Sequence, residues 1–227
     1  MIRVQSNAPL VARRLGDMAD NIVKRATVFA LNDTAADILE SNRDAMRSRF
    51  DRPTRFTQNA FIVWRANVKD AEPFAEVRER PSVGSRHYLK VQERGGKRPL
   101  TGMDRAISAA LPQASPVGVI PTRFAKTDKS GNWSRAERRK SLAAVKQPGS
   151  IKALFVASEQ TGARGLPEGI YKRLQRGKGI RKIAHFEGAD ISYKPLLGFF
   201  EGGEQVWRRE LDGHFDRIFT RLSNRQR

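Results

Sequence analysis

Apolar side chains recur every three or four positions along the N-terminal part of the chain. The repeat runs through Leu15, Met18, Ile22, Ala26 and Phe29. On a helix, this spacing places the side chains on one face that can pack against a core. We expect one long helix, or two in succession, over residues 9–49, with Asn32 and Asp33 as the place of any break and Pro53 as the end of the helical run.

A second helical pattern closes the chain, from residue 202 to residue 223. Its apolar face is formed by Val206, Trp207, Leu211, Phe215, Ile218, Phe219 and Leu222. Arg and Glu residues occupy the opposite side, as in an amphipathic helix that buries one face. We expect a C-terminal helix whose Trp207 and Phe215 side chains are buried in the hydrophobic core of the protein.

Between these two helices the hydrophobic period changes to two. FIVWRANV, from Phe61 to Val68, alternates along its length and is rich in β-branched and aromatic residues, which predicts a strand. Further strands are expected at AEVRER around Val77, at VGVI before Pro121, at IKALFVAS from Ile151, at GIYKRL from Gly169, at IRKIAHF from Ile180, and over Pro195 to Phe200. QRGKG, between two of these strands, has the composition of a hairpin tip.

Short helices are expected among these strands, over residues 88–92 and 104–111. Ser134 and Glu137 have the spacing of a capping box, which predicts a third short helix. The glycines and proline of RGGKRPLTG demand a loop.

Long helices at both ends with strands between them predict an α+β fold. We expect the two end helices to pack on a mostly antiparallel β-sheet, with extended basic loops and hairpins. A single domain over residues 1–227 is the first expectation from length. It would have a helical region at 1–56, a sheet with inserted helices and basic loops at 57–200, and the C-terminal helix at 201–227.

Positive charge is concentrated in the middle of the chain. The formal net charge is +19, from 43 Lys and Arg against 24 Asp and Glu. Residues 1–56 carry ten basic against seven acidic residues, and residues 201–227 carry six against five, so both ends are nearly balanced. Residues 123–152 carry nine against two, and residues 164–194 carry eight against three. The surplus therefore belongs to the predicted loops and hairpins.

Ten basic residues in these segments are the candidate contact residues. They are Arg135, Arg138, Arg139, Lys140, Lys172, Arg173, Arg176, Lys178, Arg181 and Lys182. They would contact a phosphate backbone without reading sequence, because no helix-turn-helix or zinc-finger frame is present. Insertion against acidic surfaces of a neighbouring subunit is an equally good interpretation.

The sequence contains no pattern typical of catalysis. His87, His185 and His214 are isolated and lack a ligand spacing such as HExxH, and neither GxSxG nor GxxxxGK[ST] occurs. A metal-dependent nuclease would need clustered carboxylates, which are scarce in the basic segments. We expect no enzyme, no cofactor and no metal, and an enzyme of packaging or lysis is the least favoured alternative.

Cysteine is absent, which excludes disulfides, thiolate zinc sites and cysteine nucleophiles. No stretch approaches the ~20 apolar residues that span a bilayer. The start MIRVQSNAPLVARR lacks the apolar run of a signal peptide. We expect a protein made in the cytoplasm without a membrane partner.

Several short motifs, in their order along the chain, resemble the minor tail protein Z group of tailed bacteriophages and prophages. They are ALNDTA (30–35), FDRPT (50–54), YLKVQERGGKRPLTGMDRAI (88–107), DKSGNWS (128–134), GLPEGIYKR (165–173) and VWRRELDGHFDRIFTRL (206–222). RAERRKSLAAV (135–145) is less apolar than the helix that the resemblance leads us to expect after DKSGNWS.

The resemblance implies a structural subunit of the virion that acts in tail completion or in the neck. Such subunits form rings, often sixfold, between the tail tube or its terminator and the head connector. The basic loops would then contact neighbouring subunits or the phage DNA backbone. The alternative is a free, sequence-independent DNA-binding protein.

Overall fold

The computed structural model describes residues 8–81, 88–112, 118–158, 165–175, 178–188 and 191–225, without the side chains of residues 8–12, 14, 17 and 88. The chain forms two compact units. Unit 1 comprises Met1–Arg86 and Leu197–Arg227, and unit 2 comprises His87–Leu196. Where the sequence predicted one domain, the long helices and the main sheet thus have separate cores.

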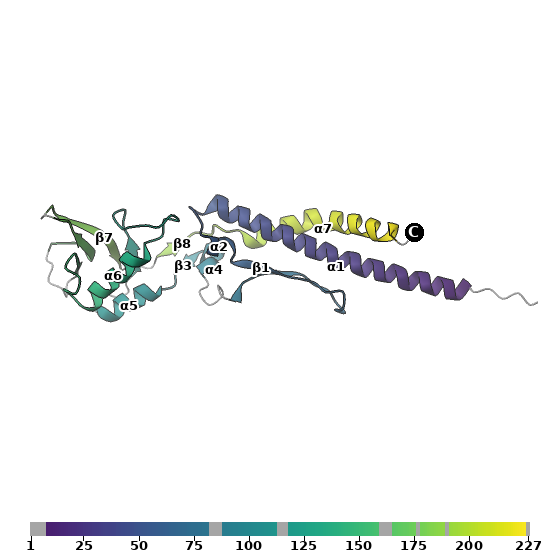
Figure 1. Cartoon of the computed structure of the whole chain (residues 1–227), viewed down its shortest axis with the longest axis horizontal. Coiled ribbons are helices and arrows are strands. Elements are labelled where there is room, and N and C mark those ends of the chain that lie inside the picture. Colours follow the sequence, from purple (N-terminus) through teal and green to yellow (C-terminus); the bar gives the residue numbers. More distant parts are fainter. Residues whose placement is uncertain are drawn as a thin grey trace, which may run out of the picture. The chain divides into compact units, whose positions relative to one another are not determined.

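Two long antiparallel helices form the body of unit 1 (Figure 1). They are α1 (Ala8–Arg49) and α7 (Phe199–Asn224). Ile218 of α7 is buried against Ala26 and Ala30 of α1, with Leu211, Phe215 and Leu222 packed around them. The small alanine side chains let the two helices approach closely, so the seam depends on Ile218 filling the space between them.

α1 is continuous through Asn32 and Asp33, where the sequence allowed a break. The Asn32 side chain donates to the Ala66 carbonyl at 3.1 Å and accepts from the Ala66 amide at 2.8 Å. The Asn32 side chain therefore holds the backbone at Ala66 and does not compete for the backbone hydrogen bonds of its own helix. This contact joins residues 34 positions apart, so local sequence pattern does not reveal it.

A two-stranded antiparallel sheet completes unit 1. β1 (Phe61–Trp64) pairs with β2 (Glu76–Glu79), with Val63 opposite Val77, and both strands contact α1. α2 (Arg55–Gln58) precedes β1 and is capped by Thr54. The Phe61 ring stacks on Phe199 at 4.6 Å between centroids, which ties the sheet to the start of α7.

The apolar faces expected on the two long helices are only partly buried. Leu15, Met18 and Phe29 of α1 are 60%, 43% and 38% exposed. Trp207 of α7 is 47% exposed, so its assignment to the core was wrong, whereas Phe215 packs on the seam as expected. The pattern marks a face that can be buried but does not specify what covers it.

Unit 2 is built on a four-stranded antiparallel sheet in the order β4-β7-β6-β5. The strands are β4 (Gly118–Pro121), β5 (Leu154–Ala157), β6 (Gly169–Arg173) and β7 (Ile180–Glu187). Pro121 lies on an edge strand, where its missing amide hydrogen costs no ladder bond. Gly169 is required where β6 approaches β7, because a Cβ there would lie 2.3 Å from the Ala184 carbonyl oxygen.

Two helices, α5 (Gly102–Ala110) and α6 (Arg135–Lys146), supply the other half of the unit 2 core. The fully buried residues Ile107, Ile170 and Ile183 lie in one cluster with Ala144 and Val145 of α6. The α+β class is confirmed, and α5 and α6 are the helices that pack on this sheet.

The smaller elements of unit 2 lie around a second antiparallel pair. α4 (Tyr88–Arg94) leads into β3 (Gly96–Lys97), which pairs with β8 (Ser192–Tyr193). The strand expected over Pro195 to Phe200 is wrong, since β8 ends at Tyr193 and α7 begins at Phe199. Proline cannot donate to a ladder, and Gly198 at φ 63° turns the chain into α7.

Replacing Ile218 by Ala should lower the free energy of unfolding by about 2–5 kcal/mol, because it removes a buried side chain from the α1–α7 seam. Trp207→Ala, on the same helix but half exposed, should cost much less. Urea denaturation followed by circular dichroism measures both. Equal losses of stability in the two variants would contradict the assignment of Ile218 to the buried α1–α7 seam.

Candidate functional site

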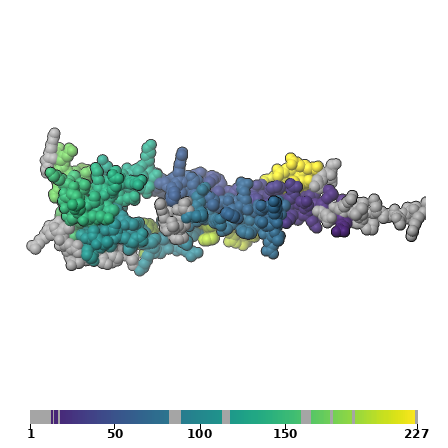
Figure 2. Space-filling model, turned by 60° about the horizontal axis from the view of Figure 1, so that its bottom comes forward, coloured from purple at the N-terminus to yellow at the C-terminus, as the bar shows by residue number. Residues whose placement is uncertain are grey.

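Three of the predicted contact residues meet at one groove in unit 2. Arg135, Arg138 and Arg139 of α6 line an open groove of about 630 Å³. Because they are spaced three and four residues apart, they share one face of the helix. The space-filling view shows the green surface around α6 next to the teal surface around α5 (Figure 2).

Another wall of this groove comes from the segment that begins α5. Arg98, Thr101 and Asp104 line it, and the apolar residues Met103, Val119 and Leu142 also contribute to the lining. The groove therefore combines a cationic rim with apolar surface. All of these residues belong to unit 2.

The buried carboxylate of Asp104 holds that wall in place. Asp104 is 1% exposed, and its Oδ2 accepts from the Thr101 amide at 2.6 Å and from Arg98 Nη2 at 3.0 Å. Its Oδ1 accepts from the Val119 amide at 2.8 Å. The Asp104 amide donates to Thr101 Oγ1, which completes a capping box at the start of α5. One side chain thus joins the loop, α5 and the edge strand β4.

A second buried carboxylate, Glu137, fixes the start of α6. The Glu137 amide donates to Ser134 Oγ, as the sequence predicted, and Glu137 Oε2 accepts from the Lys126 amide at 2.6 Å and from Trp133 Nε1 at 3.1 Å. The preceding DKSGN turn is closed by Asp128, whose Oδ1 accepts from the amides of Ser130 and Asn132. These bonds set where the arginine face of α6 lies.

The three arginines form no ion pair with any residue that the structure describes. Like charges three and four residues apart on a helix repel by about 0.2–0.5 kcal/mol per pair. Arg135 also lies in the first turn of α6, where the helix dipole disfavours a cation. The cluster costs stability, and an anion in the groove would relieve that cost.

Lys140 and Lys172 line a smaller cleft of about 180 Å³, and Glu137 is also part of its lining. Lys172 Nζ lies 3.7 Å from Glu137 Oε1, so part of its charge is compensated within the protein. The structure does not bring this pair together with the arginine groove.

The remaining hairpin cations are partly engaged with aromatic rings. Arg173 lies over Phe155 at 4.4 Å, and Arg181 lies over Phe124 at 5.3 Å. Such cation–π contacts occupy the guanidinium without neutralising it.

Lys182 is engaged with a histidine. Its Nζ hydrogen-bonds His185 Nδ1 at 2.8 Å, and burial lowers the pKa of this lysine while the Glu168 carboxylate opposes that shift. Lys178 is exposed after β6, and Arg176 lies outside the described residues.

Charge is divided unequally between the two units. Unit 2 carries 22 Lys and Arg against 8 Asp and Glu, whereas unit 1 carries 21 against 16. Most of the surplus charge of the chain is therefore in unit 2.

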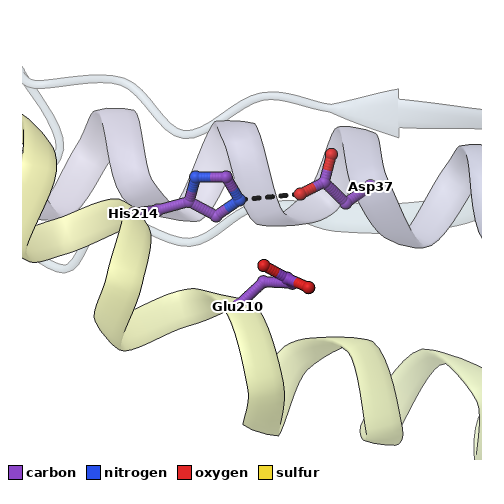
Figure 3. A group of neighbouring side chains, drawn as sticks. All are labelled: Asp37, Glu210 and His214. Atoms are coloured by element: carbon purple, nitrogen blue, oxygen red, sulfur yellow. Dashed lines mark hydrogen bonds and ion pairs between the residues drawn. The ribbon is translucent and has the colours of Figure 1, made fainter.

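The α1–α7 seam holds the only group of potential metal ligands found among the described residues: Asp37, Glu210 and His214 (Figure 3). Their ligand atoms lie within 4.8 Å of one another. His214 Nε2 hydrogen-bonds Asp37 Oδ2 at 2.7 Å, and its Nδ1 lies 2.6 Å from Arg217 Nη2. Since an arginine only donates, Nδ1 accepts and Nε2–H donates to Asp37. Both ring nitrogens are thus used, and the group is better described as a clamp between α1 and α7.

Sequence reasoning missed this clamp and the Arg98–Asp104 pair. Asp37 and His214 are 177 residues apart, and nothing local connects them. Thr101 and Asp104 do carry a signal, because they have the same capping-box spacing as Ser134 and Glu137. Among the described residues, no helix combines the length and apolar composition of a membrane span.

Comparison with known proteins gives no match to a family model, to a curated protein or to a solved structure.

Replacing Asp104 by Ala should destabilise unit 2 by about 3–5 kcal/mol, because it leaves Arg98 and two backbone amides without their buried acceptor. Asp70→Ala, at an exposed turn, is the control and should change stability by no more than about 0.5 kcal/mol. Urea denaturation measures both. A near-native midpoint for Asp104→Ala would show that the carboxylate does not organise the groove.

Proposed function

We propose that the chain is a structural subunit of a bacteriophage tail or neck, acting in tail completion or head–tail joining. It would assemble as a homo-oligomeric ring around the DNA channel of the virion. Its neighbours would be the tail tube or its terminator and the head connector. The proposal includes no catalytic role.

The observation that carries this proposal is the exposed apolar stripe of α1. At 100° per residue, Leu15, Met18 and Phe29 fall within about 60° of one another around the helix. Side chains that are 60%, 43% and 38% exposed on one stripe are typical of a surface that another molecule covers.

The end of α1 supports the same interpretation. Figure 1 shows the N-terminal part of α1 extending beyond the C-terminal end of α7. Leu15 and Met18 lie in the N-terminal part of α1, which begins at Ala8, and both are exposed. An isolated helix of about 12–15 residues is only marginally stable in water, so a neighbouring subunit would stabilise the extension. The order of the tail-protein motifs along the chain is the independent support for a phage tail.

The alternative function is that of a free, sequence-independent DNA-binding protein. The unpaired arginines of the α5–α6 groove favour DNA contact in either case. The alternatives differ in where the protein is found, because a free binding protein would be absent from purified phage particles.

Purified protein should be an oligomer, with a native mass of at least twice the chain mass of 25.6 kDa. Leu15→Glu with Met18→Glu should shift it to the monomer with little loss of stability, because both side chains are exposed. Asn21→Glu with Gln205→Glu adds the same charge at exposed polar positions and should leave the oligomer intact. Native mass spectrometry measures all three proteins.

Particles induced from a bacterium that carries the gene provide the second half of this test. The chain should co-purify with tails or complete virions and be visible by antibody labelling at the tail or neck. A strict monomer that never enters particles would contradict the proposal.

A further inference from the structure

The cationic groove of unit 2 has features that assembly alone does not explain. Arg135, Arg138 and Arg139 lie on one helical face without an acidic partner among the described residues. Arg98 lines the same groove from the α5 side. We infer that this groove is a binding site for the phosphodiester backbone of nucleic acid, contacted without reading base sequence. The inference goes beyond the proposed place in a tail and does not depend on it.

The described lining offers an anion no free carboxylate to oppose it. Asp104 is the acidic residue in that lining, and it is 1% exposed. Both of its oxygens already accept hydrogen bonds, from Thr101 and Arg98 on one side and from Val119 on the other. The negative charge of Asp104 is thus compensated by these buried donors and does not face a ligand in the groove.

Guanidinium groups in a row suit phosphates. Each presents a planar fork of donors that can bind a phosphate through two hydrogen bonds. A phosphodiester chain offers one negative charge at every nucleotide, whereas roughly 25% of the residues of an average protein are charged, and these are of both signs. Three adjacent uncompensated arginines therefore fit a regular polyanion better than an ordinary protein surface.

The apolar part of the groove fits the same ligand. Met103, Val119 and Leu142 lie beside the arginines, where sugars and base faces can pack. Trp133 also lines the groove, and its indole N–H is tied to Glu137, which fixes the ring. These apolar contacts carry no base code, which is consistent with binding that ignores sequence.

The structure also separates these arginines from the other predicted contact residues. Lys172 is paired with Glu137, and Lys182 is bonded to His185. Arg173 and Arg181 lie against aromatic rings. The groove arginines are thus expected to contribute more to binding than the hairpin cations.

The test is the salt dependence of binding to a short fluorescent DNA duplex of mixed sequence, measured by anisotropy on the full chain. Arg135→Gln, Arg138→Gln and Arg139→Gln together should reduce the slope of log K against log salt by about 3, since each lost phosphate contact removes about 1. The control replaces Lys129, Lys146 and Lys152 by Gln, three exposed lysines of unit 2 that are outside the groove lining. It should reduce the slope by less than about 1.

Two further variants serve as controls. One covers the case in which the triple variant fails to fold, and the other separates the effect of charge from that of guanidinium geometry. Arg139→Gln should reduce the slope by about 1 and is informative if the triple variant does not fold. Replacing all three arginines by Lys keeps the charge, so it should preserve most of the slope while weakening binding through the loss of bidentate contacts.

Equal losses in the groove and control triples would overturn the inference in favour of charge spread over the surface. Absence of DNA binding would also overturn it. Tighter binding of poly-glutamate than of DNA, with the same groove dependence, would assign the groove to an acidic protein. None of these results depends on ring formation or particle incorporation, so failure here and failure of the tail proposal are distinguishable.

Discussion

Three positive charges held on one face of α6 are the constraint that shapes unit 2. Arg135, Arg138 and Arg139 repel one another and have no acidic partner among the described residues. A small domain with a core of this size has only a modest margin of stability. The unit therefore needs acids that stabilise the scaffold without pairing with these three arginines.

The two buried carboxylates meet that requirement. Asp104 joins α5, the loop before it and β4: its carboxylate accepts three hydrogen bonds and its amide donates a fourth. Glu137 joins α6 to Lys126 and Trp133. Each lies below the surface, at 1% and 7% exposure. In unit 1 the charges are nearly balanced, and the Asp37–His214 bond joins the two long helices. The cationic groove lies in unit 2 and the exposed apolar side chains of α1 lie in unit 1. This division agrees with the two proposed roles, nucleic-acid binding by unit 2 and subunit assembly by unit 1.

Hydrophobic period was sufficient to predict most elements. The two end helices, the strands at Phe61, Val77, Ile151, Gly169 and Ile180, and the Ser134 cap depend on local pattern, and the structure confirms them. Local pattern left open whether the first helix breaks at Asn32, and the structure has one continuous helix there. The expectation that Trp207 lies in the core was wrong, because its periodicity matches that of Ile218 although its side chain is 47% exposed.

The groove could be predicted only in part. Composition identified α6 as cationic, but it could not distinguish the unpaired Arg138 from Lys172, whose partner is on another element. Arg98 is held at the groove by its hydrogen bond to Asp104, and the fold of the loop between the two residues sets this contact.

The proposed binding of nucleic acid in the groove lined by α5 and α6 can be tested by mapping the surface of the protein that contacts DNA. Amide chemical-shift changes in the full chain, on titration with a short DNA duplex, should concentrate on the N-terminal half of α6 and on residues 98–104. Changes confined to the β6–β7 hairpin or to unit 1 would contradict it.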